Sequence, residues 1–83
     1  MTKSVFSNAY RLFLNELVQT RKACHITQVR LAESLRRPQS FVSKYESGER
    51  RLDIIEVWQI LNAMNVNPKT FFENLDIHFK TLK

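Results

Sequence analysis

Apolar side chains recur every three or four residues along most of this chain, which is the period of an amphipathic helix. Tyr10, Phe13, Leu14 and Leu17 illustrate this spacing near the N-terminus. Alternation of apolar and polar residues, the pattern of a half-buried strand, is nearly absent before residue 75. The pattern therefore predicts an all-α domain, with helices over about residues 6–22, 28–35, 38–46, 53–64 and from 67 onward.

Residues that favour helix ends stand between these segments. Pro38 suits the first turn of a helix because its missing N–H would be unpaired there. Gly48 permits the left-handed turn that closes a helix. The predicted boundary residues are Ser4 or Ser7, Thr27, Pro38, Gly48, the capping box of Asp53 and Glu56, and Asn67 followed by Pro68.

The C-terminal residues from 75 onward fit two patterns. Phe72, Leu75, Phe79 and Leu82 are spaced three, four and three residues apart, which favours a helix. In the same stretch, apolar Leu75, Ile77 and Phe79 alternate with polar residues, which favours a strand. Both alternatives stay open, so the all-α domain is expected to end in a helical tail or a short strand.

Three apolar residues carry specific expectations. Trp58 falls on the apolar stripe of the helix over 53–64, so we expect it to pack in the core. Phe41 is expected to pack against Tyr45, one turn further along, rather than to contact a partner molecule. Cys24 is expected to pack at the end of the first helix.

Composition indicates one ordinary globular domain over residues 1–83. The chain is 43% hydrophobic and 25% charged, and its single cysteine excludes an internal disulfide framework. No apolar run approaches the roughly 20 residues that span a bilayer, so a cytoplasmic protein is expected. Cys24, His25 and His78 lack the spacing of metal ligands, and no catalytic arrangement of residues stands out. We therefore expect no metal, no cofactor and no enzymatic activity.

Positive charge is concentrated in the first two thirds of the chain. The net charge is +5 overall, with +3 in residues 1–26, +3 in residues 27–51 and −1 in residues 52–83. A basic face of this kind favours an anionic partner such as nucleic acid.

The helix over 38–46 has two chemically different sides. On a wheel of 100° per residue, one side holds Phe41, Val42 and Tyr45. The other side holds Gln39, Ser40, Ser43 and Lys44. Glutamine, serine and lysine can hydrogen-bond base edges, and the major groove is wide enough for one helix. Two short helices joined by a tight turn, the second with such an edge, are typical of a DNA-reading motif.

The stretch TQVRLAESLRRPQSFVSKYESGERR resembles the XRE-like helix-turn-helix family, which includes the phage repressors and Cro proteins. The resemblance extends over about residues 8–72, with the helix-turn-helix motif at about 27–47. It implies a compact five-helix, lambda-repressor-like DNA-binding domain. It also implies a bacterial or phage transcriptional regulator, with double-stranded DNA as its partner.

The resemblance also implies roles for the matched positions. The base-reading residues would be Gln39, Ser40, Ser43 and Lys44. The phosphate-binding residues would be Gln28, Ser47, Gly48, Arg50 and Arg51, with Gln28 also supporting Gln39. Arg21 and Glu46 would form a structural ion pair that ties the first helix to the third.

Two positions depart from the family pattern. The family often has glycine where this chain has His25, at the end of the first helix, and where it has Arg36, in the turn of the motif. A residue with a β-carbon is strained in a left-handed conformation, so the turn is expected to be altered. Arg36 and Arg37 would also add charge beside the groove.

One recognition helix reads only a few base pairs, so specificity normally requires a two-fold dimer on a palindromic operator. We expect such a homodimer, with residues 66–83 in its interface through Phe71, Phe72, Leu75 and Phe79. Two alternatives stay open: an antitoxin that also binds a toxin protein, and a protein-interaction module built on the same scaffold.

Overall fold

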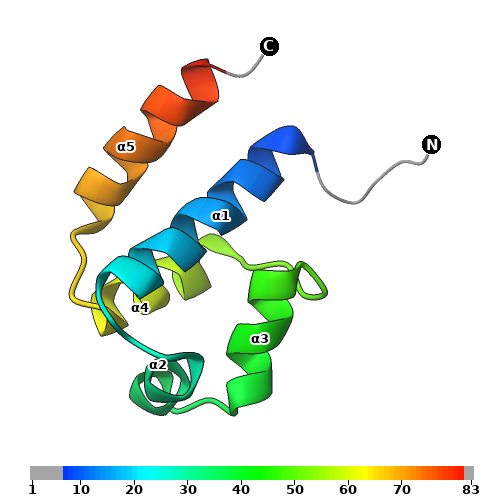
Figure 1. Ribbon diagram of the computed structural model, residues 1–83, viewed down its shortest axis with the longest axis vertical. Helices are drawn as coiled ribbons and strands as arrows, with labels where there is room; N and C mark the ends of the chain where they lie inside the picture. Colours follow the sequence, from blue (N-terminus) through cyan, green and yellow to red (C-terminus); the bar gives the residue numbers. More distant parts are fainter. Residues whose placement is uncertain (1–6, 82–83) are drawn as a thin grey trace.

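Five helices make up the part of the chain that the computed structural model describes, residues 7–81, and this part contains no strand (Figure 1). Ser4, residue 6 and Leu82, which entered the predictions, lie outside it. The helices are α1 (Asn8–Ala23), α2 (Gln28–Leu35), α3 (Gln39–Ser47), α4 (Ile54–Ala63) and α5 (Pro68–Lys80). The prediction of an all-α domain is confirmed.

The predicted caps set most of these boundaries. The Ser7 hydroxyl accepts a hydrogen bond from Tyr10 N at 3.0 Å, and Thr27 caps α2 in the same way. Asp53 and Glu56 form the predicted capping box at α4. Pro38 differs slightly, because it is the N-cap of α3 rather than its first helical residue, and it supplies no side-chain hydrogen bond.

The C-terminal ambiguity is resolved in favour of a helix. Figure 1 shows α5 beside α1, with the two helices running in opposite directions. Leu75 is 3% exposed, and Phe79 packs against the core from the next turn. His78 Nδ1 lies 2.8 Å from Glu16 Oε2 on α1. A helix presents Leu75 and Phe79 on one side toward α1, whereas a strand here would need a partner strand for its backbone.

All five helices contribute to one apolar core. The largest fully buried side chains are Leu17, Leu31, Val42, Tyr45, Ile60 and Leu61. Phe41 is buried and meets the Tyr45 ring at a centroid distance of 5.5 Å, as expected from their spacing. Because α2 and α3 both bury side chains in this core, their packing fixes the angle between the two helices.

The expectation that Trp58 packs in the core is wrong. Its side chain is 55% exposed, and Ile54 and Ile55 on the same helix are 66% and 59% exposed. The cause is that α4 packs against the rest of the molecule through a narrow strip of its surface, which buries Val57 and, one turn on, Ile60 and Leu61. Trp58 lies about 100° around the helix from Val57, beyond the reach of the neighbouring helices.

The two positions without the family's glycine keep the left-handed conformation. His25 has φ 58° and Arg36 has φ 57°, ψ 44°. The Arg36 and Arg37 amides donate to the last carbonyls of α2, as in a normal left-handed helix end. The expected alteration of the turn is therefore absent, although a left-handed non-glycine residue costs about 1–2 kcal/mol. Cys24, just before His25, is exposed rather than packed.

Candidate nucleic-acid interface

The helix α3 presents a polar edge beside the turn of the motif. Gln39, Ser40 and Lys44 are exposed, and Ser43 is partly exposed. Its other side is buried through Phe41, Val42 and Tyr45. The backbone torsions and the buried anchors hold this edge in one orientation, which a helix needs if it is to read a groove.

A chain of hydrogen bonds supports the start of that edge from behind. Arg21 on α1 binds Glu46 on α3, with Nε to Oε2 at 2.7 Å and Nη2 to Oε1 at 3.1 Å. Gln28 Nε2 donates to Glu46 Oε1 at 2.8 Å. Gln39 Nε2 then lies 3.4 Å from Gln28 Oε1, a long contact. The network connects α1, α2 and α3 and ends at Gln39, whose amide is of the kind that can pair with adenine.

The Arg21–Glu46 pair is well shielded from water. The side chains are 11% and 7% exposed, and Arg21 also donates to the carbonyl of Ile26 at 2.8 Å. The hydrogen bond to Glu46 raises the pKa of Arg21 above its already high usual value. The pair therefore fixes α1 against α3, and it lies behind the polar edge rather than on it.

A second cluster of charges joins the turn before α3, the loop after it and the first turn of α4. Arg50 donates two hydrogen bonds to the Glu56 carboxylate, at 3.0 and 2.8 Å, and Arg37 Nη2 is 3.5 Å from the same group. Both guanidinium groups lie over the Phe41 ring, at 4.2 Å for Arg37 and 5.0 Å for Arg50. The hydrogen bond from Arg50 lowers the pKa of Glu56. Two cations are thus held beside the start of α3.

The role of Glu56 in this cluster was missed by sequence reasoning. Its position in the capping box was evident, but its contacts with Arg37 and Arg50 depend on how the loop folds back. The only signal in the sequence is a pair of opposite charges six residues apart, just after Gly48, and it is weak. Arg37 is 39% exposed, so it keeps donors that face solvent.

The other predicted phosphate-binding residues are partly engaged within the loop. Ser47 Oγ donates to Lys44 O at 3.1 Å and accepts from Glu49 N at 3.4 Å. The Gly48 amide, at φ 90°, donates to Tyr45 O at 3.2 Å. Arg51 lies over the Tyr10 ring at 4.1 Å. The loop is therefore internally braced at Ser47 and Gly48, with Arg51 docked on α1.

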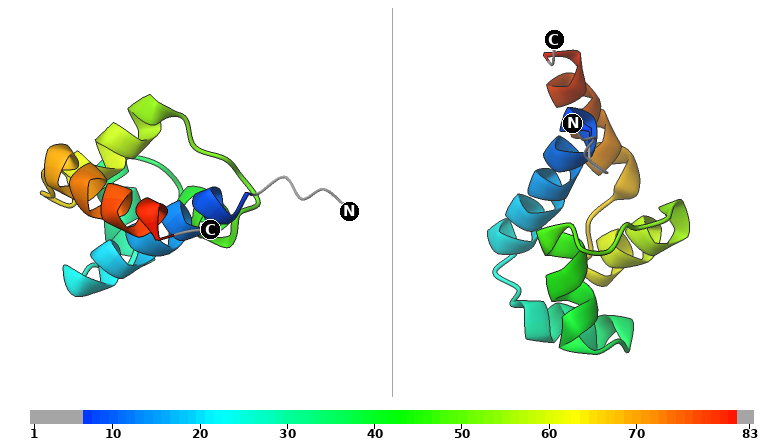
Figure 2. Two further views of the ribbon diagram at one scale, coloured as in Figure 1. Left: turned by 90° about the horizontal axis from the view of Figure 1, so that it is seen from above. Right: turned by 90° about the vertical axis from the view of Figure 1, so that its right-hand side faces the viewer.

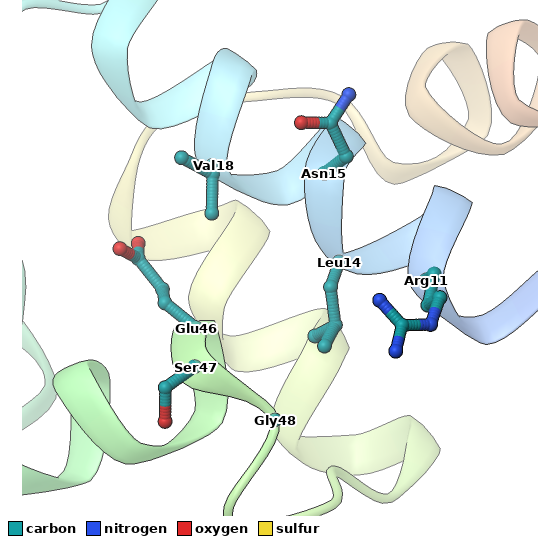
Figure 3. A pocket seen from close by; sticks show the side chains of 7 residues that line it. All are labelled: Arg11, Leu14, Asn15, Val18, Glu46, Ser47 and Gly48. Carbon is teal, nitrogen blue, oxygen red and sulfur yellow. The ribbon is translucent and has the colours of Figure 1, made fainter. Parts of the chain in front are cut away.

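A shallow pocket of about 260 Å³ lies between α1 and the end of α3 (Figure 3). Figure 3 shows Arg11 on the α1 side, with Glu46, Ser47 and Gly48 across from it. Arg11 is exposed and adds a cation near the loop that the sequence analysis did not select. The pocket is lined by Arg11, Leu14, Asn15, Val18, Glu46, Ser47 and Gly48.

The four residues expected in a dimer interface are divided by burial. Phe71 is 4% exposed and Leu75 is 3% exposed, so both belong to the core of a single chain. Phe72 is 37% exposed, and Phe79 is partly buried. Only Phe72 and part of Phe79 are accessible to another molecule.

Among residues 7–81, no three His, Cys, Asp or Glu side chains are grouped so that they could hold a metal ion. None of the helices there combines the length and the apolar character needed to cross a membrane.

Comparisons with known proteins agree with this geometry. The profile of the helix-turn-helix family matches residues 17–71. The chain is similar to a solved XRE-family like protein from Pseudomonas syringae pv. tomato str. DC3000, with 41% identity and TM-score 0.80 over 84% of this chain and 85% of that one. It is also similar to a point mutant of the restriction-modification controller protein C.Esp1396I, with 23% identity and TM-score 0.82 over 93% and 98% of the two chains. No curated protein sequence matched.

The fold and the polar edge of α3 define a class, the DNA-binding transcriptional regulators of helix-turn-helix type. The matched segment runs from within α1 to the start of α5 and includes the whole of α2 and α3. Within that class, the chain belongs to the XRE-like helix-turn-helix family. The resemblance drawn from the sequence is confirmed.

Proposed function

We propose that this protein binds a palindromic DNA operator as a homodimer and regulates transcription there. Each copy would place α3 in a major groove, with the two helices about one turn of DNA, roughly 34 Å, apart. The observation that carries the proposal is the two-sided character of α3, with Phe41, Val42 and Tyr45 buried and Gln39 and Lys44 exposed.

Sequence would be read by the exposed edge. Gln39, at the start of α3, can pair with adenine through its amide, and its position is supported by Gln28. Lys44 lies on the same side and can reach guanine or a phosphate. Ser40 and Ser43 lie between them; Ser43 Oγ is 3.3 Å from Ser40 O, a bond that it can exchange for a base contact.

Phosphate contacts would come from the cations around this edge. Arg37 and Arg50 share one carboxylate, that of Glu56, so the three groups together keep one net positive charge. Arg51 and Arg11 add charge near the end of α3. Such contacts supply affinity without sequence information and make binding depend steeply on salt.

Selection of bound sequences from random double-stranded DNA tests this function directly. The expected result is an enriched inverted repeat whose half-sites are about 10–10.5 base pairs apart, centre to centre. Repeating the selection with Gln39→Ala should change the preference at one position of each half-site. Failure to enrich any sequence at low salt would contradict sequence-specific DNA binding, and enrichment of a single half-site would contradict the dimer.

A further inference from the structure

The outer side of α4 is a large apolar surface that no other helix of residues 7–81 covers. It holds three of the largest exposed hydrophobic side chains, those of Ile54, Ile55 and Trp58. The exposed amides of Gln59 and Asn62 continue it along the helix. We call these five residues the α4 face. Figure 2 shows α4 at an edge of the molecule in both views.

Charge separates the α4 face from the rest of the surface. Residues 57–68 contain no charged side chain, although the protein carries a net charge of +5. The one charged residue within α4, Glu56, is turned toward Arg37 and Arg50 and is 12% exposed. Surfaces that combine exposed aromatic and aliphatic groups with a lack of charge are typical of the centre of a protein interface.

We propose that the α4 face is the surface through which two copies of this chain associate, about a two-fold axis. This inference rests on the homodimer of the proposed function and moves its contact away from residues 66–83. A two-fold interface brings the same patch of each copy together, so the patch must be complementary to itself. Two +5 molecules repel each other wherever basic surfaces meet. The α4 face itself has no charged side chain, although Arg36 and Arg37 line a hollow beside Gln59 and Asn62.

The outer side of α5 fits this role less well. Its exposed apolar residues, Phe72 at 37% and Ile77 at 61%, stand among exposed charged ones. Lys80 pairs with Asp76 at 3.2 Å on that side, so an interface there would have to desolvate or break an ion pair. No such cost applies to Ile55 and Trp58.

The size of the α4 face predicts how strongly the copies associate. A ten-residue helix is about 15 Å long. Trp58 at 55% exposure leaves on the order of 100 Å² of aromatic surface in water. The whole face is therefore near the low end of protein interfaces, which total about 1,200 Å² or less. The dimer should dissociate on dilution. The longest extent of the molecule, 36 Å, is close to the roughly 34 Å between successive major grooves on one side of DNA.

Trp58 is the only tryptophan in the chain, so its fluorescence reports on this surface directly. The experiment follows the full chain without DNA over a wide range of concentration, by analytical ultracentrifugation and by tryptophan emission. We expect self-association, with emission that shifts to shorter wavelength as the dimer forms and returns on dilution. Ile55→Glu should weaken association at least tenfold and keep the emission at the long-wavelength position throughout.

Ile77→Glu is the matched control, since it makes the same change at a similarly exposed isoleucine on α5. It should leave both association and the emission shift unchanged. Far-ultraviolet circular dichroism checks that each variant is folded, and Ile55→Ser replaces Ile55→Glu if the latter is not. The proposal would be overturned if the wild-type chain stayed monomeric, or if a dimer formed without any shift of the tryptophan emission. It would also be overturned if Ile77→Glu disrupted the dimer and Ile55→Glu did not. Because no DNA is present, these results stand apart from the operator selection.

Discussion

Two arginine–glutamate pairs flank α3, and they differ in how much water reaches them. Arg21 and Glu46 lie behind the helix, 11% and 7% exposed, with Gln28 as a further partner. Arg50, in the loop after it, and Glu56, in the first turn of α4, are 40% and 12% exposed, with Arg37 nearby. Both pairs have bidentate geometry. Bidentate geometry alone therefore does not assign a role to such a pair, since only the exposed pair keeps donors that a phosphate could reach.

The largest expected effect comes from breaking the shielded pair. Glu46→Ala leaves the Arg21 guanidinium with little water and without its carboxylate, so the free energy of unfolding should fall by about 3 kcal/mol. Glu56→Ala should cost only about 1 kcal/mol, mostly through the lost hydrogen bond from the Asp53 amide in the capping box, because its arginines can turn to solvent. Urea denaturation of both variants measures the difference. Equal losses would remove the distinction between the two pairs.

The polar edge that the shielded pair supports should respond differently from the pair itself. Gln39→Ala should leave the free energy of unfolding nearly unchanged and cost roughly 1–3 kcal/mol of binding at the preferred operator. The loss should shrink to near zero when one base pair of each half-site is changed. Binding isotherms on a set of single-substituted operators make this measurement. A uniform loss on all of them would show that Gln39 does not read a base.

The exposed pair can be tested by salt dependence. Arg50→Ala should weaken binding to every DNA sequence and reduce the slope of log affinity against log salt by about one. Lys80→Ala removes the same charge from α5, which lies away from α3 in Figure 1, and should leave that slope unchanged. If Arg50→Ala leaves the slope intact, Arg50 serves only to hold Glu56 and the loop.

Much of this arrangement could be predicted from the sequence, because local signals set it. Thr27 and Asp53 cap the N-termini of their helices, as predicted from their side chains, and the helical wheel of α3 correctly placed Tyr45 on the buried side. The exposure of Trp58 could not be predicted, since periodicity shows which residues share a helix side but not how much of that side a neighbour covers. The Arg50–Glu56 contact depended likewise on the path of the loop.

The smallest expected effect is on the free energy of unfolding at acid pH. Arg50 and the Asp53 N–H hydrogen-bond the Glu56 carboxylate and hold its pKa below the usual range, so protonation opposes the folded state. The stabilisation is therefore fully present above the unfolded-state pKa of about 4.3 and is lost as the pH falls through the lower folded-state pKa.

Glu56→Gln keeps an oxygen for the Asp53 amide but cannot titrate. Its free energy of unfolding should fall less steeply than that of the wild type between about pH 5 and pH 3. Parallel pH profiles for the two proteins would show that the contact with Arg50 does not contribute to stability, and the loop would then owe its shape to Gly48 and the cap alone.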